Sequence, residues 1–269
     1  MQKNSEIILE CKDITKKFTI TSNFFGKKTE IIALNNVSLF IRKNEILGLV
    51  GESGSGKSTL GRIILKLIPP DSGTIFFDNR DITKLDNKAM KELRPQIQAI
   101  FQDPLSSLNP RLPVIELLRE PLQIHTKKTK KEIDDEIATT LEQVGINLKD
   151  VYKYPHEFSG GQRQRINIAR ALLLKPKFIV ADEPVSSLDV SIQAQILNLF
   201  MESQKTYGFS MLFISHDLRI IRHISDRIAV ITNGEIVEIG NIEQIFTNPT
   251  HTYTQKLISS LPEKHFIRF

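Results

Sequence analysis

A nine-residue stretch at positions 51–59 constrains the fold of this chain more than any other feature. It follows a short apolar run at residues 46–50 and precedes a sequence of helical character at residues 59–67. Glycines at this spacing turn backbone N–H groups inward around an anion, while the helix start and a lysine add positive potential. A glycine-rich turn capped by Ser58 is the alternative, but so many constrained positions between a strand and a helix favour a phosphate-binding loop. Its residues are Gly51, Glu52, Ser53, Gly54, Ser55, Gly56, Lys57, Ser58 and Thr59, and the hydroxyl of Ser58 is also a candidate Mg²⁺ ligand.

Two adjacent carboxylates predict the other half of a nucleotide site. The apolar run at residues 178–181 has the composition of a buried strand and leads directly into Asp182 and Glu183. We expect Asp182 to hold Mg²⁺ through its water shell and Glu183 to polarise the attacking water as the general base. An acidic pair that only ends a strand and caps the next turn is the alternative, and it is less favoured beside the loop at 51–59.

Short apolar runs that alternate with helical segments predict an α/β fold. The runs at 46–50, 178–181 and 211–215 favour a parallel sheet covered on both faces. Alternating residues at 37–41 and 74–77, and an Asn-Gly turn at 233–234, predict attached antiparallel sheet. Residues 111–157 have helical periodicity and no strand candidate, which indicates a helical lobe. We interpret its lysine cluster as a solvated helix face rather than a nucleic-acid patch, since no aromatic residues are interleaved; its members are Lys127, Lys128, Lys130 and Lys131.

Composition excludes several classes of protein. With 269 residues and 40% hydrophobic content, the chain can bury one large core, or one core with an added lobe. A net charge of +5 suggests an anionic partner, such as nucleotide, nucleic acid or lipid head groups, without choosing among them. Cys11 is the sole cysteine, so neither an internal disulfide nor a thiolate zinc or iron-sulfur site can form. No apolar run approaches the ~18 residues of a bilayer span, so we expect any membrane role to be peripheral.

A second anion site is predicted at residues 159–162, where Ser-Gly-Gly-Gln opens a helix expected over 162–174. Ser159 stands where an N-cap would, and the two glycines expose the first backbone N–H groups. Simple helix capping is the local alternative. The chain also carries Gln102 after an apolar pair, Asp189 after Ser-Leu, and His216 after a buried strand. In this order the set resembles ATP-binding-cassette proteins over nearly the whole chain.

That resemblance implies a phosphate-loop NTPase fold of the RecA-like type: a mixed-sheet core with an antiparallel β subdomain and a helical subdomain. It implies a single cassette over residues 1–262, with the helical lobe at about 111–165 and a short C-terminal extension at 245–269. Two cassettes would pair head to tail, so that the 51–59 loop of one and the 159–162 segment of the other enclose each ATP. The residues assigned to the second segment are Ser159, Gly160, Gly161 and Gln162.

The resemblance also gives roles to single residues, with ATP and Mg²⁺ as the cofactors. Gln102 senses the γ-phosphate and Mg²⁺ and couples to the permease, His216 hydrogen-bonds the γ-phosphate, and Asp189 organises the contact between cassettes. Phe18 matches the aromatic that stacks on adenine, although Phe24 and Phe25 are close by and a core or loop aromatic is a fair alternative.

Three segments, at residues 101–111, 154–158 and 248–262, resemble the bacterial oligopeptide, dipeptide and nickel importers, and in particular their second ATP-binding subunit. This implies an ATPase that energises import of oligopeptides or dipeptides. The partners would be two permease subunits, a second related cassette and an extracytoplasmic binding protein, at the cytoplasmic face of the inner membrane and without nucleic acid. A nickel importer is the first alternative, and a translation-associated cassette or a non-hydrolysing regulatory module is less favoured.

Overall fold

The computed structural model describes residues 6–21, 28–103 and 106–261, and the chain divides into two compact units. The first unit combines residues 1–88 with residues 210–269, and the second unit is formed by residues 89–209. The first unit therefore brings the two ends of the sequence into one body, while the middle of the chain folds separately.

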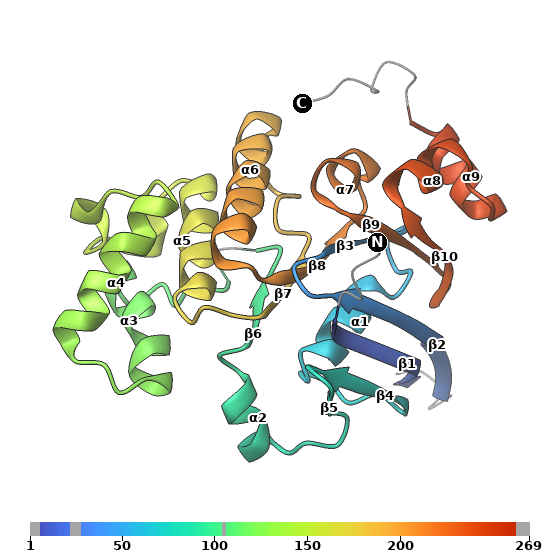
Figure 1. The fold of residues 1–269 in the computed structure, drawn as a ribbon, viewed down its shortest axis with the longest axis horizontal. Helices are drawn as coiled ribbons and strands as arrows, with labels where there is room; N and C mark the ends of the chain where they lie inside the picture. The colour runs from blue at the N-terminus through green and yellow to red at the C-terminus, as the bar shows by residue number, and fades with distance from the viewer. Residues whose placement is uncertain (1–5, 22–27, 104–105, 262–269) are drawn as a thin grey trace. The chain divides into compact units, whose positions relative to one another are not determined.

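An antiparallel sheet occupies the N-terminal part of the first unit (Figure 1). Its two long strands, β1 (Ile7–Thr21) and β2 (Lys28–Arg42), pair in a register that sets Leu9 beside Ile41, and both side chains are fully buried. The alternation at 37–41 and 74–77 falls within this sheet, so the prediction of antiparallel strands there is confirmed. In spatial order the strands are β2 (Lys28–Arg42), β1 (Ile7–Thr21), β4 (Ser72–Phe77) and β5 (Arg80–Asp81).

The first unit also contains a parallel core in which β3 (Ile46–Val50) lies between β8 (Ser210–Ser215) and β9 (Arg227–Thr232). Every residue of β3 and β8 is buried, as expected for strands covered on both faces. A tight hairpin joins β9 to the antiparallel β10 (Glu235–Asn241). Asn233 and Gly234 have φ values of 50° and 78°, the left-handed pair of a type I′ turn, so the hairpin prediction is confirmed.

Helices complete the first unit. Helix α1 begins at Lys57, two residues before the predicted start, and ends at Ile64 rather than at 67. Lys66 adopts a positive φ of 56°, which turns the chain out of the helix. The other helices of this unit are α7 (Leu218–Ile224), α8 (Ile242–Thr247) and α9 (Thr252–Ser259).

The second unit pairs two parallel strands with a set of helices. Strands β6 (Ile97–Ile100) and β7 (Phe178–Asp182) run parallel, and no strand interrupts the described residues of 111–157, as predicted. Helix α5 begins at Gly160 and ends at Leu172, two residues ahead of the predicted 162–174, because Ser159 already caps it. The remaining helices are α2 (Asn87–Leu93) at the boundary of the units, α3 (Val114–His125), α4 (Lys130–Gln143) and α6 (Val190–Tyr207).

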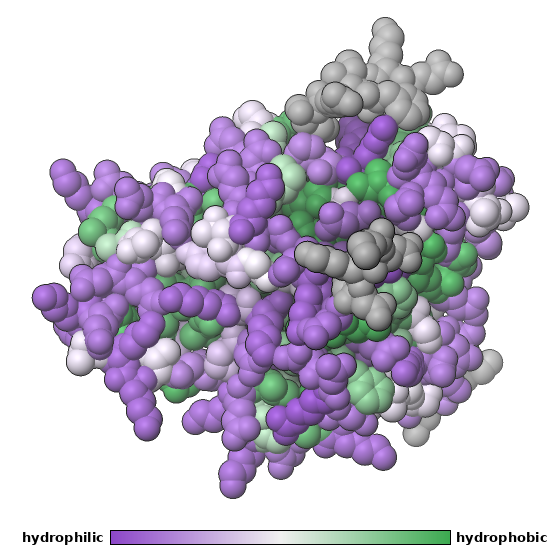
Figure 2. All heavy atoms as spheres, in the orientation of Figure 1, coloured by the Kyte–Doolittle hydropathy of each residue, from purple (hydrophilic) through white to green (hydrophobic). Residues whose placement is uncertain are grey.

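The lysine cluster at residues 127–131 lies just before and at the start of α4. Lys127, Lys128, Lys130 and Lys131 are all exposed, while Ile133, Ile137 and Leu141 of the same helix are buried. Over α3 and α4, polar and charged side chains predominate on the face drawn in Figure 2. No helix in the described part of the chain has the length and apolar character needed to cross a membrane.

Candidate active site

The loop at 51–59 connects β3 to α1 and owes its path to glycine. Gly54 and Gly56 have φ values of 81° and 104°, in the region that favours glycine. A Cβ on Gly56 would lie 2.5 Å from the carbonyl oxygen of Ala33, and one on Gly51 would lie 2.1 Å from that of Ile231. Other residues at these positions would push the loop away from the strands beneath it.

The charges of this loop suit an anion. Lys57 is only 5% exposed, and its Nζ donates to the carbonyl oxygens of Gly51 and Glu52, at 2.7 Å each. Gly56 is the N-cap of α1 and offers no side-chain acceptor to the first turn. The Oγ of Ser55 is buried without a hydrogen-bond partner among the described residues. A lysine beneath the loop, an uncapped helix start and a buried hydroxyl form a donor set that fits phosphate oxygens.

His216 lies at the same edge of the sheet as this loop. Strands β3 and β8 are parallel neighbours with Val50 opposite Ser215, so the residues that follow them, Gly51 and His216, emerge side by side. Asp217 fixes the next turn, since its carboxylate accepts from the backbone N–H and the guanidinium of Arg219. Burial alone would raise the pKa of Asp217, but these hydrogen bonds outweigh burial and lower it. The first unit therefore holds the loop and His216 together.

In the second unit, the parallel strands β6 and β7 bring Gln102 and the acidic pair to one edge. Ile100 lies opposite Ala181, so the carboxyl ends of both strands meet there. Gln102 is exposed, whereas Asp182 is 9% exposed. Glu183 has a φ of 48°, a left-handed conformation that is strained for a residue with a side chain and that is typical of functional sites.

The donor set for Mg²⁺ consists of few protein groups. No cluster of three or more His, Cys, Asp or Glu side chains that could hold a metal occurs among residues 6–21, 28–103 and 106–261. Mg²⁺ prefers oxygen ligands, keeps several of its waters and is usually bound through a few side chains together with substrate phosphates. Ser58 in the first unit carries an oxygen of this kind, as do Gln102 and Asp182 in the second unit.

The Ser-Gly-Gly-Gln turn is a complete capping box. The Ser159 hydroxyl accepts from the N–H of Gln162 at 3.3 Å, and the Gln162 side chain accepts from the N–H of Ser159 at 2.9 Å. A Cβ on Gly161 would lie 2.6 Å from Cγ2 of Ile192, and one on Gly160 would lie 3.3 Å from Cδ2 of Leu188. The turn therefore packs closely against residues 188–192, a contact that the sequence analysis missed.

Asp189 stands within that contacting segment, at the N-cap of α6. Its carboxylate accepts from the N–H of Ile192 at 3.0 Å and from the hydroxyl of Ser191 at 2.8 Å. These hydrogen bonds hold the pKa of Asp189 below its ordinary value. The second unit thus groups Asp189 with residues 159–162, and Gln102 with Asp182 and Glu183.

Phe18 is an exposed aromatic on β1. Phe18 is 41% exposed, and the ammonium of Lys16 lies 5.7 Å from the centroid of its ring. This exposure leaves ring surface for stacking, and the adenine assignment stays a prediction. Phe24, Phe25, Pro104 and Leu105, which also figured in the sequence analysis, lie outside the described residues.

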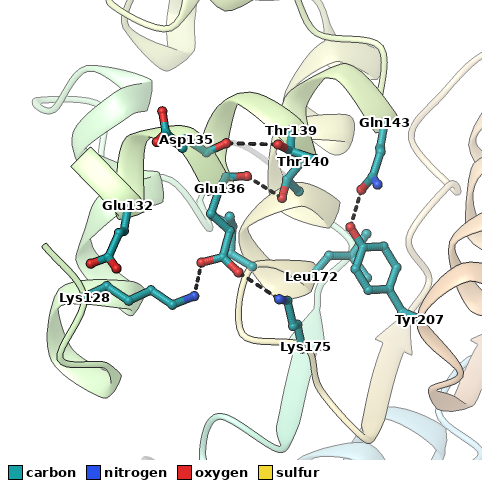
Figure 3. Close-up of a pocket in the computed structure, with 11 residues that line it drawn as sticks. Lys128, Glu132, Asp135, Glu136, Thr139, Thr140, Gln143, Leu172, Lys175 and Tyr207 are labelled. Carbon is teal, nitrogen blue, oxygen red and sulfur yellow. Dashed lines mark hydrogen bonds and ion pairs between the residues drawn. The ribbon is translucent and has the colours of Figure 1, made fainter. Parts of the chain in front are cut away.

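A cavity of about 510 Å³ lies elsewhere in the second unit (Figure 3). Its two lysines, Lys128 and Lys175, both pair with Glu136, and the hydroxyl of Tyr207 donates to Gln143. Because both lysines already pair with Glu136 and none of the motif residues lines the cavity, we assign no nucleotide to it. Its lining residues are Lys128, Glu132, Asp135, Glu136, Thr139, Thr140, Gln143, Leu172, Leu173, Lys175 and Tyr207.

One residue near the phosphate loop was not assigned to it from the sequence. The hydroxyl of Tyr253, on α9, accepts a hydrogen bond from the backbone N–H of Glu52 at 3.1 Å. The Tyr253-centred segment stood out in the sequence only as a likeness to importer tails, so nothing local predicted contact with a loop about 200 residues earlier.

Comparison with known proteins gives two family matches. Residues 34–186 match the model described as ABC transporter, and residues 237–266 match the model described as oligopeptide/dipeptide transporter, C-terminal region. The chain is 48% identical to the oligopeptide transport ATP-binding protein AppF of Bacillus subtilis, over 96% of this chain and 79% of that protein. It is also 48% identical to the oligopeptide transport ATP-binding protein OppF of Streptococcus mutans, over 98% of this chain and 84% of that protein.

A solved structure agrees with these matches. The dimeric structure of a post-hydrolysis state of the ATP-binding cassette MJ0796 bound to ADP and Pi superimposes with a TM-score of 0.78 at 29% identity. The alignment covers 87% of this chain and 98% of that one.

Proposed function

The chain belongs to the ATP-binding-cassette transporter family, and on this premise we propose how its residues hydrolyse ATP to drive a peptide importer. It is an ATP-binding and ATP-hydrolysing subunit, and it energises the import of oligopeptides or dipeptides across a bacterial membrane. The named relatives and the match at 237–266 support peptide cargo rather than nickel. We extend the proposal to a single cassette over residues 1–262, with its helical lobe at about 111–165 and a C-terminal extension at 245–269.

The phosphate loop carries this proposal. Its left-handed glycines, the buried Lys57 and the uncapped start of α1 form a cradle that binds the β- and γ-phosphates. Phe18 stacks on the adenine, with the remaining loop residues contributing backbone N–H groups. Ser58 and Gln102 would hold Mg²⁺, with Asp182 acting through its water shell, and the ion would supply positive charge against the charge that develops on the phosphates.

Hydrolysis needs a base and a group that reports the γ-phosphate. Glu183 orients and polarises the attacking water, and its strained backbone fixes the carboxylate at the end of β7. His216 hydrogen-bonds the γ-phosphate from the edge it shares with the loop. Gln102 senses the same phosphate and transmits its presence to the permease.

A second cassette completes the site. The first-turn N–H groups of α5, presented by residues 159–162, face the γ-phosphate held by a partner, while Asp189 organises the contact. Closure is favoured only while a γ-phosphate bridges the two anion sites, so hydrolysis releases it. The chain acts with membrane permease subunits as a peripheral protein. In the finer form of the proposal there are two permeases, one related but non-identical cassette and an extracytoplasmic binding protein, at the cytoplasmic face of the inner membrane.

Replacement of the proposed base tests this function. Glu183→Gln should leave ATP binding intact and lower turnover of the assembled transporter by ~10² to 10⁴-fold, because only proton transfer is lost. Glu202→Gln, an exposed residue of α6, is the matched control and should turn over normally. Near-normal hydrolysis by Glu183→Gln would remove the general-base assignment.

Replacement of the loop lysine tests the phosphate assignment separately. Lys57→Ala should weaken both binding and turnover, since an ammonium aimed at the phosphates acts in the ground state as well as in the transition state. Unchanged affinity for a fluorescent ATP analogue would contradict a phosphate-binding loop at 51–59.

A further inference from the structure

The peptide unit between Gly51 and Glu52 is held from both of its polar ends. Its carbonyl oxygen, that of Gly51, accepts from Nζ of Lys57 at 2.7 Å. Its N–H, that of Glu52, donates to the hydroxyl of Tyr253 at 3.1 Å. Because a peptide group is planar, fixing the N–H also fixes the direction of the carbonyl. The tyrosine hydroxyl thereby sets the position of an oxygen that holds the loop lysine.

Tyr253 is in turn fixed by a carboxylate within the sheet. Glu238 on β10 is only 7% exposed, and it accepts from the N–H of Thr250 at 2.8 Å, from the Thr250 hydroxyl at 2.9 Å and from the N–H of His251 at 3.1 Å. His251 is the N-cap of α9 and accepts from the N–H of Tyr253 through Nδ1 at 3.2 Å. Three hydrogen bonds to one buried carboxylate anchor the start of α9 firmly.

An irregularity in β10 explains how Glu238 reaches this segment. The register between β9 and β10 shifts between Ile236 and Glu238, where Ile236 pairs with Ile231 and Glu238 with Val230. A bulge of this kind re-aims the side chains that follow it. The result is a continuous chain of contacts from β10 through residues 250–251 and Tyr253 to the phosphate loop, all within the first unit.

We propose that residues 249–253 form a strut that sets the geometry of the phosphate loop, with Tyr253 as a positioning residue for nucleotide binding. The inference rests on the proposed function of the 51–59 loop and adds a structural role for the C-terminal extension. Tyr253 acts through the Gly51–Glu52 peptide and Lys57, and it makes no contribution to the hydrolytic step itself.

This role predicts a split between binding and turnover. Without the tyrosine hydroxyl, the Gly51–Glu52 peptide can rotate, and the loop loses conformational freedom only when nucleotide binds. A neutral hydrogen bond of this kind corresponds to a roughly two- to tenfold change in an equilibrium constant. The KM for ATP should rise by that factor. The kcat should stay within about twofold of normal, since the effect is limited to binding.

The test compares Tyr253→Phe with Tyr207→Phe, which removes a hydroxyl from the second unit that bonds Gln143. The dissociation constant for a fluorescent ATP analogue is measured on the full chain, and KM and kcat on the assembled transporter. We expect weaker binding and a raised KM for Tyr253→Phe alone, with kcat retained. Unchanged binding and KM, or a loss confined to kcat, would overturn the strut.

A double-mutant cycle tests whether the carboxylate and the tyrosine act in series. Glu238→Gln should raise KM in the same way, and the double variant should show no more than the larger single effect. Multiplying effects would refute a common strut. If Glu238→Gln folds poorly, Thr250→Val takes its place in the cycle, because it removes only the hydroxyl that donates to Glu238. The turnover of Lys57→Ala compared with that of the wild-type transporter keeps the two proposals apart. This comparison tests the phosphate-loop assignment whatever Tyr253→Phe shows.

Discussion

Gly161 should be needed for packing as well as for any anion that residues 159–162 bind. An alanine there would place its Cβ 2.6 Å from Cγ2 of Ile192, well inside van der Waals contact, so α5 or α6 must shift. Overpacking of this kind costs about 1–3 kcal/mol, and the gain in helix propensity over glycine returns at most about 1 kcal/mol. We expect Gly161→Ala to lower the free energy of unfolding by up to about 2 kcal/mol and the melting temperature by up to roughly 8 °C.

The neighbouring glycine is the matched control. A Cβ on Gly160 would lie 3.3 Å from Cδ2 of Leu188, the mobile end of a flexible side chain, so Gly160→Ala should be neutral or slightly stabilising. In an Ile192→Ala background the clashing methyl is gone, and Gly161→Ala should then cost less. Thermal and denaturant unfolding of the four variants measure this. Equal stability of Gly160→Ala and Gly161→Ala would refute the packing argument.

Three further outcomes are expected. Ser159→Asp keeps a good N-cap but adds a negative charge, so it should abolish the ATP-dependent pairing of cassettes, which is measured by light scattering. The neutral cap of Ser159→Asn should pair normally, and pairing by both variants would contradict a shared site. Burial would raise the pKa of Glu238, but hydrogen bonds from Thr250 and His251 outweigh burial and lower the pKa from 4.5. The ionised carboxylate therefore stabilises the fold above pH 4.5, and this contribution is lost as the pH falls through the lowered pKa. The difference in unfolding free energy between wild type and Glu238→Gln should narrow in acid, and a difference independent of pH would contradict this. Burial, with a smaller effect of Glu10, raises the pKa of Cys11 from 9.0 to about 12, which lowers its thiolate fraction roughly a thousandfold. At about pH 8 a thiol reagent should label the unfolded chain at once and the native chain only slowly. Rapid labelling of the native chain would contradict the burial of Cys11.

Much of the fold could be predicted because its signals are local. The apolar runs at 46–50, 178–181 and 211–215 stand out in the sequence, and each falls within a buried strand. The Asn233-Gly234 turn specifies its own hairpin through two left-handed residues. Helix ends were less predictable. Helix α1 starts at Lys57 because Gly56 turns the chain into it, and α5 starts at Gly160 because the capping box closes around Ser159. Both starts depend on backbone geometry rather than on side-chain periodicity.

Residue patterns alone could not predict contacts between segments far apart along the sequence, and His216 was assigned to the γ-phosphate only through the family resemblance. The register of β3 and β8 puts His216 beside the phosphate loop, and a bulge in β10 brings Glu238 to the tail. Neither pairing has a local signature, because register is settled by which faces are buried together. The bond between Tyr253 and Glu52 depends on both of these pairings, which belong to the same sheet.

The packing of Gly161 also decides how the shared site can be tested. A charged residue at 161 would disturb the contact with Ile192 and repel a partner's phosphate at the same time, so a loss of pairing could not be attributed to charge. Ser159 avoids this ambiguity. It is exposed, its hydroxyl accepts the cap hydrogen bond of α5, and aspartate and asparagine cap a helix about equally well. A difference between those two variants therefore reports the electrostatics of residues 159–162, and a difference between Gly160→Ala and Gly161→Ala reports their packing.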